Sequence, residues 1–485
     1  MTLEAPNSAR RGAAALLMRR PQLWGGATAV AAVVIFLLSL AYFGGIVDPG
    51  EKLRHLPVAV VNQDRLSPGN TAGKGAQIAD ALIARADKDQ RLRLQPMSMA
   101  EATDRLDSGS VYGALVIPPD FSTRLHNLLE QRVATAPEQP EVTLLTNPRA
   151  GSLGVSFTSG GLQPAWAAVS RRIGHDLLAQ PAARSAAPAA RLLLADPLKL
   201  TVTPYRPLPA NSGIGLSAFY YTVLILLAGY LGASVISGIF DTAVGHAFGE
   251  AHASLTYRSP VAISRTRLFL AKCATSAALG PVAATMIASA CLLLGVDTPH
   301  AALLWVFTSA AIAAVGIGQQ ALVAAFGSLA PLLGTFIFMA LALPSSGGTV
   351  PLQALPSFFR FLSLFEPARH IIGGVRSIMY FDARGDAGLA GAWAVTGLAA
   401  SGALLFGLFV TRRLELRPRL SGQTFAAVRG AATQLFTGPT PSPTLRPEDG
   451  AHCDSAGLNT RPGDSAGLNS PPGPHRPGEP GRSRF

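Results

Sequence analysis

The sequence predicts a polytopic α-helical membrane protein that carries an α/β domain between its first and second membrane spans. Only 14% of its 485 residues are charged, against about a quarter in soluble domains. Its mean hydropathy is +0.32, so we expect much of its surface to face lipid. A purely soluble enzyme is therefore excluded. Five uncharged stretches are each long enough to cross a bilayer: residues 24–47, 213–240, 273–296, 301–359 and 387–411.

The fourth stretch is too long for a single span. Its apolar part, residues 301–343, would extend about 64 Å as one helix, whereas the hydrocarbon core is about 30 Å thick. Because glycine and proline break helices, we expect a turn at residues 327–331, with residues 316–320 as the alternative. The six predicted spans are therefore residues 24–47, 213–240, 273–296, 301–326, 330–343 and 387–411.

The first span follows Arg10, Arg11, Arg19 and Arg20, as a signal peptide would. Its apolar run is longer than the usual signal core, and residues 43–49 do not form a small-x-small cleavage site. We interpret it as a retained anchor.

Basic residues beside short loops set the orientation of a membrane protein. They gather in residues 1–23, in the 241–272 connection and in residues 412–437, and six spans place all three on one side. We therefore predict a multi-pass plasma-membrane protein with both termini in the cytoplasm. The net charge of +12 is then explained by lipid head groups and not by nucleic acid. The predicted exterior loop 344–386 dissents, since it carries Arg360, Arg369, Arg376 and Arg384.

Residues 48–212 have the size and mixed charge of a globular domain, which the orientation places outside the cell. Runs rich in β-branched residues alternate with helical patterns, as in a small α/β domain. Residues 180–195 fit either a helix or a spacer. Strands are expected at residues 56–61, 91–94, 111–117, 141–145 and 198–203, and helices at residues 76–86, 98–106, after residues 118–120 and at 163–178.

The C-terminal residues 438–485 are rich in proline and glycine, and a short unit at residues 454–459 returns at 464–469. Such a segment buries too little apolar surface to offset its ordering entropy, so we predict a disordered cytoplasmic tail. The chain has three cysteines, at positions 273, 291 and 453, and this odd number argues against a disulfide framework.

Motifs for chemistry are few. Residues 69–75 resemble a phosphate-binding loop but lack the serine or threonine that would meet magnesium, so we expect no ATP binding by this chain. The spacing of His246, Glu250 and His252 does not suit a metal site on a helix. None of the six spans contains an ionisable residue, which weakens ion-coupled transport. We predict no enzymatic activity, no catalytic residue, no cofactor and no metal.

Two loops are candidate functional elements. Residues 343–351 cannot form a regular helix, and the aromatic residues 355–362 suit the membrane interface, so this region is either an exit element or a surface lid. The exit-element residues are Pro344, Ser345, Ser346, Gly347 and Gly348. The 241–272 connection either docks a partner protein, through Tyr257, Arg258 and Arg265, or is a plain positive loop.

Three stretches carry a family resemblance: residues 56–64, residues 113–122 and the 344–348 turn before the last span. In this order and spacing they resemble the YhgE/Pip membrane proteins, which overlap the DUF3533, nitrosoguanidine-resistance-like group of the ABC-2 permease superfamily. The resemblance covers roughly residues 24–413.

The resemblance implies a permease-like membrane domain, a homodimer and, in some relatives, a separate ATPase. It raises Tyr257 to Arg265 as the ATPase-contact loop, and it makes the 344–348 turn the re-entrant exit element. It implies no catalytic residues. The long domain between the first two spans is usual for YhgE/Pip proteins but absent from minimal ABC-2 permeases.

The leading functional hypothesis is an ABC-2-type permease that exports a hydrophobic or amphipathic compound, or an envelope component, with a separate ATPase subunit. The alternative is a membrane receptor or envelope-assembly protein that does not transport and acts through residues 48–212. Ion-coupled efflux is a third hypothesis. The predicted partners are the lipid bilayer, an ATPase and a second copy of the chain, and not nucleic acid.

Overall fold

The computed structural model describes residues 21–65, 73–130, 139–180, 188–244, 249–251, 254–256 and 263–416. These residues all belong to one compact unit, Met1–Pro418. The predicted tail 438–485, its repeat and Cys453 lie outside the described residues.

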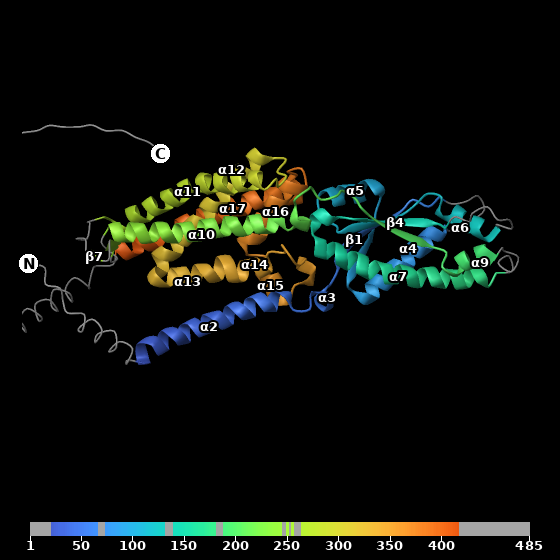
Figure 1. Cartoon of the computed structure of the whole chain (residues 1–485), viewed down its shortest axis with the longest axis horizontal. Coiled ribbons are helices and arrows are strands. Elements are labelled where there is room, and N and C mark those ends of the chain that lie inside the picture. Colours follow the sequence, from blue (N-terminus) through green and yellow to red (C-terminus); the bar gives the residue numbers. More distant parts are fainter. Residues whose placement is uncertain are drawn as a thin grey trace, which may run out of the picture. The chain divides into compact units, whose positions relative to one another are not determined.

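The α/β domain follows the first long helix, α2 (Pro21–Ile46), and a single turn, α3 (Pro49–Lys52) (Figure 1). Helix α7 (Ser152–Leu178), which has an internal proline, lies in the chain between the fourth and fifth strands. The strands are β1 (Leu56–Asn62), β2 (Leu92–Pro96), β3 (Gly113–Ile117), β4 (Glu141–Thr146) and β5 (Lys199–Pro204). The helices are α4 (Lys74–Asp89), α5 (Met99–Asp107), α6 (Phe121–Glu130), the short η1 (Pro148–Ala150), α7 (Ser152–Leu178) and α9 (Pro188–Ala195).

The five strands form one mixed sheet in the order β2-β1-β3-β4-β5. β1 pairs in parallel with β2 and β3, β3 pairs antiparallel with β4, and β4 pairs in parallel with β5. Side chains of a strand alternate between faces, so Leu56 and Val58 pack with α4 and α7 while Ala59 and Val61 pack with α5. The sheet is thus covered on both faces, as the sequence pattern predicted for an α/β domain.

Outside the α/β domain the described residues are mostly helical, and five helical stretches among them, including Thr28–Ile46 of α2, are long and apolar enough to cross a membrane. Residues 249–251 and 254–256 form a two-stranded hairpin, β6 (Gly249–Ala251) and β7 (Ser254–Thr256). The helices are η2 (Gly213–Gly215), α10 (Ser217–Ala243), α11 (Arg265–Leu293), α12 (Ala301–Phe326), η3 (Gly327–Leu329), α13 (Ala330–Thr335), a π-helical stretch (Phe336–Leu341), α14 (Ala342–Ser345), η5 (Leu352–Ala354), α15 (Ser357–Leu362), α16 (Pro367–Tyr380), a second π-helical turn (Gly385–Leu389) and α17 (Ala390–Leu416).

The long stretch from Ala301 to Ser345 reverses direction after α12. The chain turns at Gly327, whose φ of 57° is left-handed, and α13 then packs back along the end of α12. The amide of Gln319 donates to the carbonyl of Ala330 at 3.4 Å, and a Cβ at Gly318 would lie 3.2 Å from the Phe338 ring. The break falls at the expected residues 327–331, while α12 continues through the alternative site at 316–320. The count of six membrane crossings stays a prediction.

Hydrogen bonds between helices hold the bundle together. The Tyr221 hydroxyl lies 3.0 Å from that of Thr308, and the Tyr230 hydroxyl donates to the Pro331 carbonyl at 2.9 Å. The amide of Gln320, fully buried on α12, donates to the Ala233 carbonyl of α10 at 2.8 Å. These polar side chains connect neighbouring helices, where apolar surroundings make an unpaired polar group costly.

One ion pair lies just beyond the predicted ends of the second and third spans, within helices α10 and α11. Lys272, whose side chain is only 7% exposed, pairs with Asp241 at 2.7 Å between α11 and α10. Its ammonium group also donates to the hydroxyl of Ser237 at 2.9 Å. The predicted spans stopped at residue 240 and began at residue 273 because each charge was taken as a boundary. The two charges neutralise each other, so both helices continue past them.

Candidate functional site

The predicted exit element forms a tight turn directly after α14. Pro344 and Ser345 end this short helix, and Ser346, Gly347 and Gly348 follow as bends. Ser345, Ser346 and Gly348 are buried. The 344–348 turn is irregular as expected, although its first two residues belong to a helical turn.

Two glycines fit the turn between helices. Gly347 has a φ of 71°, in the left-handed region that favours glycine. A Cβ at Gly348 would lie 2.3 Å from the Phe219 ring of α10 and 2.6 Å from Ile372 of α16. The backbone at Gly348 therefore approaches both helices more closely than any other residue would allow.

Arg376 of α16 donates hydrogen bonds to backbone carbonyl groups of the turn. Its guanidinium donates to the Gly348 oxygen at 2.7 Å and to the Gly347 oxygen at 3.4 Å. Among the described residues no carboxylate pairs with Arg376, and its Nε is buried without a hydrogen-bond partner. Burial lowers the pKa of Arg376, and the nearby tyrosines Tyr112 and Tyr380 oppose that shift. The turn is thus fixed by a cation that no acidic side chain neutralises.

The α/β domain also lies close to Arg376. Tyr112, just before β3, packs against both the core of the α/β domain and the core of the helix bundle. Burial raises the pKa of Tyr112, which Arg376 partly offsets. A Cβ at Gly151, at the start of α7, would lie 3.7 Å from an Arg376 nitrogen. Arg376 therefore lies between the turn and the α/β domain.

The chain after the turn completes the core of the α/β domain. Val350, Leu355 and Phe359 are buried in the same apolar cluster as strands β1 and β3. The amide of Arg54 donates to the Gln353 carbonyl at 2.9 Å, which ties this segment to the start of the domain. The aromatic piece predicted for the membrane interface is therefore divided, since Phe359 is buried while Phe358 and Phe361 are exposed.

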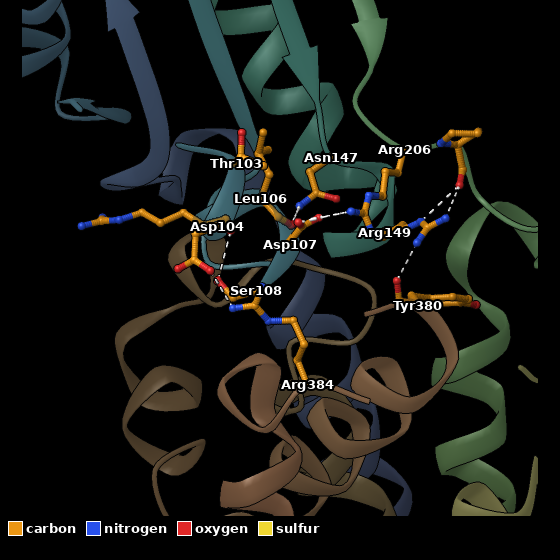
Figure 2. Close-up of polar contacts among 12 residues, drawn as sticks. Thr103, Asp104, Leu106, Asp107, Ser108, Asn147, Arg149, Arg206, Tyr380 and Arg384 are labelled. Carbon is orange, nitrogen blue, oxygen red and sulfur yellow. Dashed lines mark hydrogen bonds and ion pairs between the residues drawn. The ribbon is translucent and has the colours of Figure 1, made fainter. Parts of the chain in front are cut away.

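A second set of polar contacts, here called the junction, joins α5 to the segment after α16 (Figure 2). Arg384 donates to Asp104 of α5 at 2.7 Å and to Asp386 at 2.6 Å. These hydrogen bonds raise the pKa of the Arg384 guanidinium. Residues 280 positions apart in the chain are thereby linked across the two parts of the unit.

Arg149 of η1 strengthens the junction through main-chain oxygens. It donates to the Tyr380 carbonyl at 2.9 Å and to the Pro207 carbonyl at 3.2 Å (Figure 2). Burial lowers the pKa of Arg149, with Arg206 as the second cause. Nearby, the Arg206 guanidinium pairs with Asp107 at 3.1 Å.

A glycine and an aromatic ring interlock beside these ion pairs. Gly109 has a φ of 65°, and a Cβ there would lie 2.7 Å from the ring of Phe381. The side chains around this contact leave a cavity of about 140 Å³. Its lining is mainly polar and includes Asp107, Asn147, Arg149, Arg206 and Arg384.

Glu366 is a buried carboxyl group between α15 and α16. It is 5% exposed, and burial raises its pKa to about 7. The backbone amide of Ala368 opposes this shift. Glu366 therefore changes charge near neutral pH, close in sequence to the helix that holds the turn.

The predicted ATPase-contact residues are only partly described. Tyr257 and Arg258 lie outside the described residues. Arg265 is the exposed first residue of α11, whose N-terminal amide at Thr266 donates to Glu415 of α17 at 2.9 Å. Gly348 and Arg265 lie at opposite ends of α10, since Gly348 meets Phe219 near its start. The structure therefore does not bring the two candidate elements together.

Arg376, Tyr112 and the junction arginines were not predicted as site residues. Their partners are distant in sequence, so no local motif marks them. The one signal in the sequence was that a loop predicted to lie outside the cell carries four arginines. Two of these four, Arg376 and Arg384, make the contacts described above.

The comparison with protein families is decisive for classification. The family described as "Protein of unknown function (DUF3533)" matches residues 28–399. The chain belongs to the DUF3533 family. The predicted family is therefore confirmed, and its match covers α2, the α/β domain and most of the helix bundle.

Curated proteins and solved structures give no close match to the chain. No curated protein matches the chain. A crystallised domain assigned to an ABC type-2 transporter from Thermotoga maritima MSB8 is 19% identical and covers 31% of this chain and 85% of that domain, with a TM-score of 0.23. At that score the similarity carries no argument about this member of DUF3533.

Proposed function

We propose that this DUF3533 protein is the membrane subunit of an ABC-2-type exporter in the plasma membrane. It would move a hydrophobic or amphipathic compound, or an envelope component, with energy from a separate ATPase. In this proposal both termini are cytoplasmic, the α/β domain is exterior, and Arg265 with Tyr257 and Arg258 belongs to the ATPase contact. The homodimer implied by the family resemblance is part of the proposal.

The observation that carries the proposal is the 344–348 turn, with its interrupted helices. The turn lies where the helix bundle meets the α/β domain, since Val350 and Leu355, just after it, are buried in the core of that domain. The carbonyls of Gly347 and Gly348 accept hydrogen bonds from Arg376, and the turn is wedged between α10 and α16. A buried irregular turn at this end of the bundle supports an exit element, which a simple anchor would not need.

The fold also offers a route for coupling. α10 is 27 residues long and spans about 40 Å between the turn and the predicted ATPase side. The Lys272 pair joins its far end to α11, which begins at Arg265. A movement at the start of α11 would therefore reach the turn through packed helices.

Reconstitution tests the proposal. The full chain is placed in nanodiscs with a candidate ABC ATPase from the same organism, and ATP turnover is measured with and without amphipathic compounds. We expect stimulation by substrate, and we expect Arg376→Gln to reduce it by about tenfold while the ATPase still binds. Arg360→Gln, in the same loop, is the matched control. Mass photometry of the same sample measures the number of copies.

Two results would contradict the proposal. One is an ATPase that neither co-purifies nor responds to the chain. The other is a reporter at either terminus that is found outside the cell. Deletion of residues 75–195, an obvious test of a receptor function, is unsuitable because it would uncover Val350, Leu355 and Phe359. Point substitutions therefore separate transport from surface binding more cleanly.

A further inference from the structure

The α/β domain carries a groove between α4 and α7, on the face of the sheet opposite α5. The groove has a volume of about 650 Å³, within the usual range for ligand sites of about 300–1,000 Å³. Small side chains keep it open, since Ala81, Ala84 and Ala168 line its walls. One face of each helix lines it, because the lining residues recur at spacings of three and four.

The two ends of the groove differ in character. α7 runs antiparallel to α4, because Gly161 in its first half lies against Leu92, just after the end of α4. The end formed by the start of α4 is therefore the end formed by the last turns of α7. Lys74, Gln77 and Asp176 lie at that end together with four large apolar side chains, of which Ile173 is partly exposed and the others belong to the domain core: Ile78, Leu125, Ile173 and Leu177.

The opposite end is basic. Arg85 and Lys88 lie one turn apart at the end of α4, whereas Arg172 lies on α7 next to Ile173, toward the apolar end. Lys74 lies at the apolar end and bonds to Gln77 at 3.3 Å. Within the described ranges none of these four cations has a carboxylate partner, and Asp176 is the one acidic side chain in the lining. The described lining thus carries a net charge of +3, and no ion pair within the described residues neutralises its cations.

We propose that this groove binds a single-chain phospholipid with a phosphate monoester head. The acyl chain would lie against Ala81, Val169 and Ile173, and the phosphate would meet Arg85 and Lys88. A phosphate monoester carries about −1.5 to −2 charges at neutral pH, so it neutralises this lining better than a carboxylate does. The inference concerns binding alone and does not depend on the transport function proposed above.

The lining argues against other occupants. No strand edge borders the groove, so an extended peptide would find no backbone groups to pair with. No aromatic side chain lines it, so nucleic-acid bases would have no surface on which to stack. A long apolar chain needs only an open apolar groove, such as the one that Ala81, Ala84 and Ala168 line.

Photo-crosslinking tests the assignment on the full chain in phosphatidylcholine nanodiscs. The probe is an alkyne-tagged lysophosphatidate with a diazirine in its acyl chain, and mass spectrometry maps the labelled peptides. We expect labels on α4 and α7, displaced by excess unlabelled lysophosphatidate. Lysophosphatidylcholine, whose head group has no net charge, should displace the probe at least tenfold less well.

Variants separate the two halves of the site. Arg85→Glu with Lys88→Glu should reduce labelling at least tenfold, and Ala81→Trp should do the same by filling the channel. Arg171→Glu is the matched control, because it is exposed on α7 next to Arg172 but does not line the groove. Circular dichroism and thermal unfolding check that each variant is folded.

Four outcomes overturn the proposal. Labelling could survive both the charge reversal and Ala81→Trp in folded protein, or it could be confined to α10–α17. Stearate could displace the probe as well as lysophosphatidate does, which would remove the phosphate assignment. An acidic peptide that displaces the probe would make the groove a peptide site.

Discussion

The junction and the Lys272 pair use similar bonds in opposite surroundings. The Arg384–Asp104 distance and the Lys272–Asp241 distance are both 2.7 Å. The side chains of Arg384 and Asp104 are 34% and 63% exposed, whereas those of Lys272 and Asp241 are 7% and 30% exposed. Water and salt screen the first pair, and apolar helices surround the second.

This difference indicates what each region does. Buried charges are costly to separate, so the Lys272 pair fixes α10 against α11. Exposed pairs contribute little, so the ion pairs of the junction add little to the link between the α/β domain and the helices. The apolar contacts of Tyr112, Val350 and Phe359 supply most of that link.

The largest effect is expected at the buried pair. Asp241→Leu leaves Lys272 of α11, whose side chain is only 7% exposed, without its charge partner and should cost about 3–5 kcal/mol of unfolding free energy. Arg267→Met, an exposed position on the same helix, should have little effect. Thermal unfolding in nanodiscs measures both changes.

The double variant Lys272→Met with Asp241→Leu sharpens this comparison. Removing both charges should restore most of the lost stability, because no uncompensated charge remains. If the double variant is as unstable as the sum of the two single variants, the pair does not act as a unit.

The next largest effect concerns pH and Glu366. Its carboxyl pKa is raised from 4.5 to about 7 in the folded protein, so folding favours the protonated form. Stability should therefore fall as pH rises from about 4.5 to about 7, by about 3 kcal/mol in all, and stay at the lower level above that. Glu366→Gln should remove this loss and unfold at a higher temperature at pH 8.

Unfolding scans from about pH 4.5 to 8.5 measure this dependence, with Glu51→Gln as the control for an exposed carboxylate. Identical pH profiles for Glu366→Gln and the natural protein would show that Glu366 is ionised in the folded state at low pH as well.

The elements within each region were largely predictable, while the contacts between regions were not. All five strands of the sheet overlap segments predicted to be extended. The turn at Gly327 falls at the preferred of the two sites that glycine and proline offered. Phe359 was expected at the membrane interface, since its neighbours Phe358 and Phe361 are aromatic, yet it completes a core nearly 300 residues earlier in the chain.

Charges misled the prediction in a consistent way. Asp241 and Lys272 were taken as span boundaries, and Arg376 was counted only as evidence on orientation. Each has a buried role that depends on a partner elsewhere in the chain: Lys272 on Asp241, and Arg376 on the carbonyls of the 344–348 turn. Composition and periodicity describe one segment at a time, so they cannot reveal such partners.

A smaller effect is expected where Gly109 meets Phe381. Gly109→Ala places a side chain at a φ of 65° and within 2.7 Å of the aromatic ring, which should cost about 2 kcal/mol. Gly160→Ala is the matched control, since nothing lies within 4 Å of its added Cβ on α7. Thermal unfolding measures both variants, and equal stability of the two would contradict the interlocking contact.

The smallest effect is expected at the exposed ion pair of the junction. Asp104→Asn removes the charge that Arg384 meets on α5, but Asp386 still pairs with the same guanidinium at 2.6 Å. The change in unfolding temperature should therefore be smaller than in every variant above, and it should vanish at about 1 M salt, where the screening length is about 3 Å. Asp80→Asn, an exposed carboxylate on α4, is the control for removal of a surface charge. A large, salt-resistant loss in Asp104→Asn would mean that the junction fixes the two parts as firmly as the Lys272 pair fixes two helices, and the contrast between these regions would no longer hold.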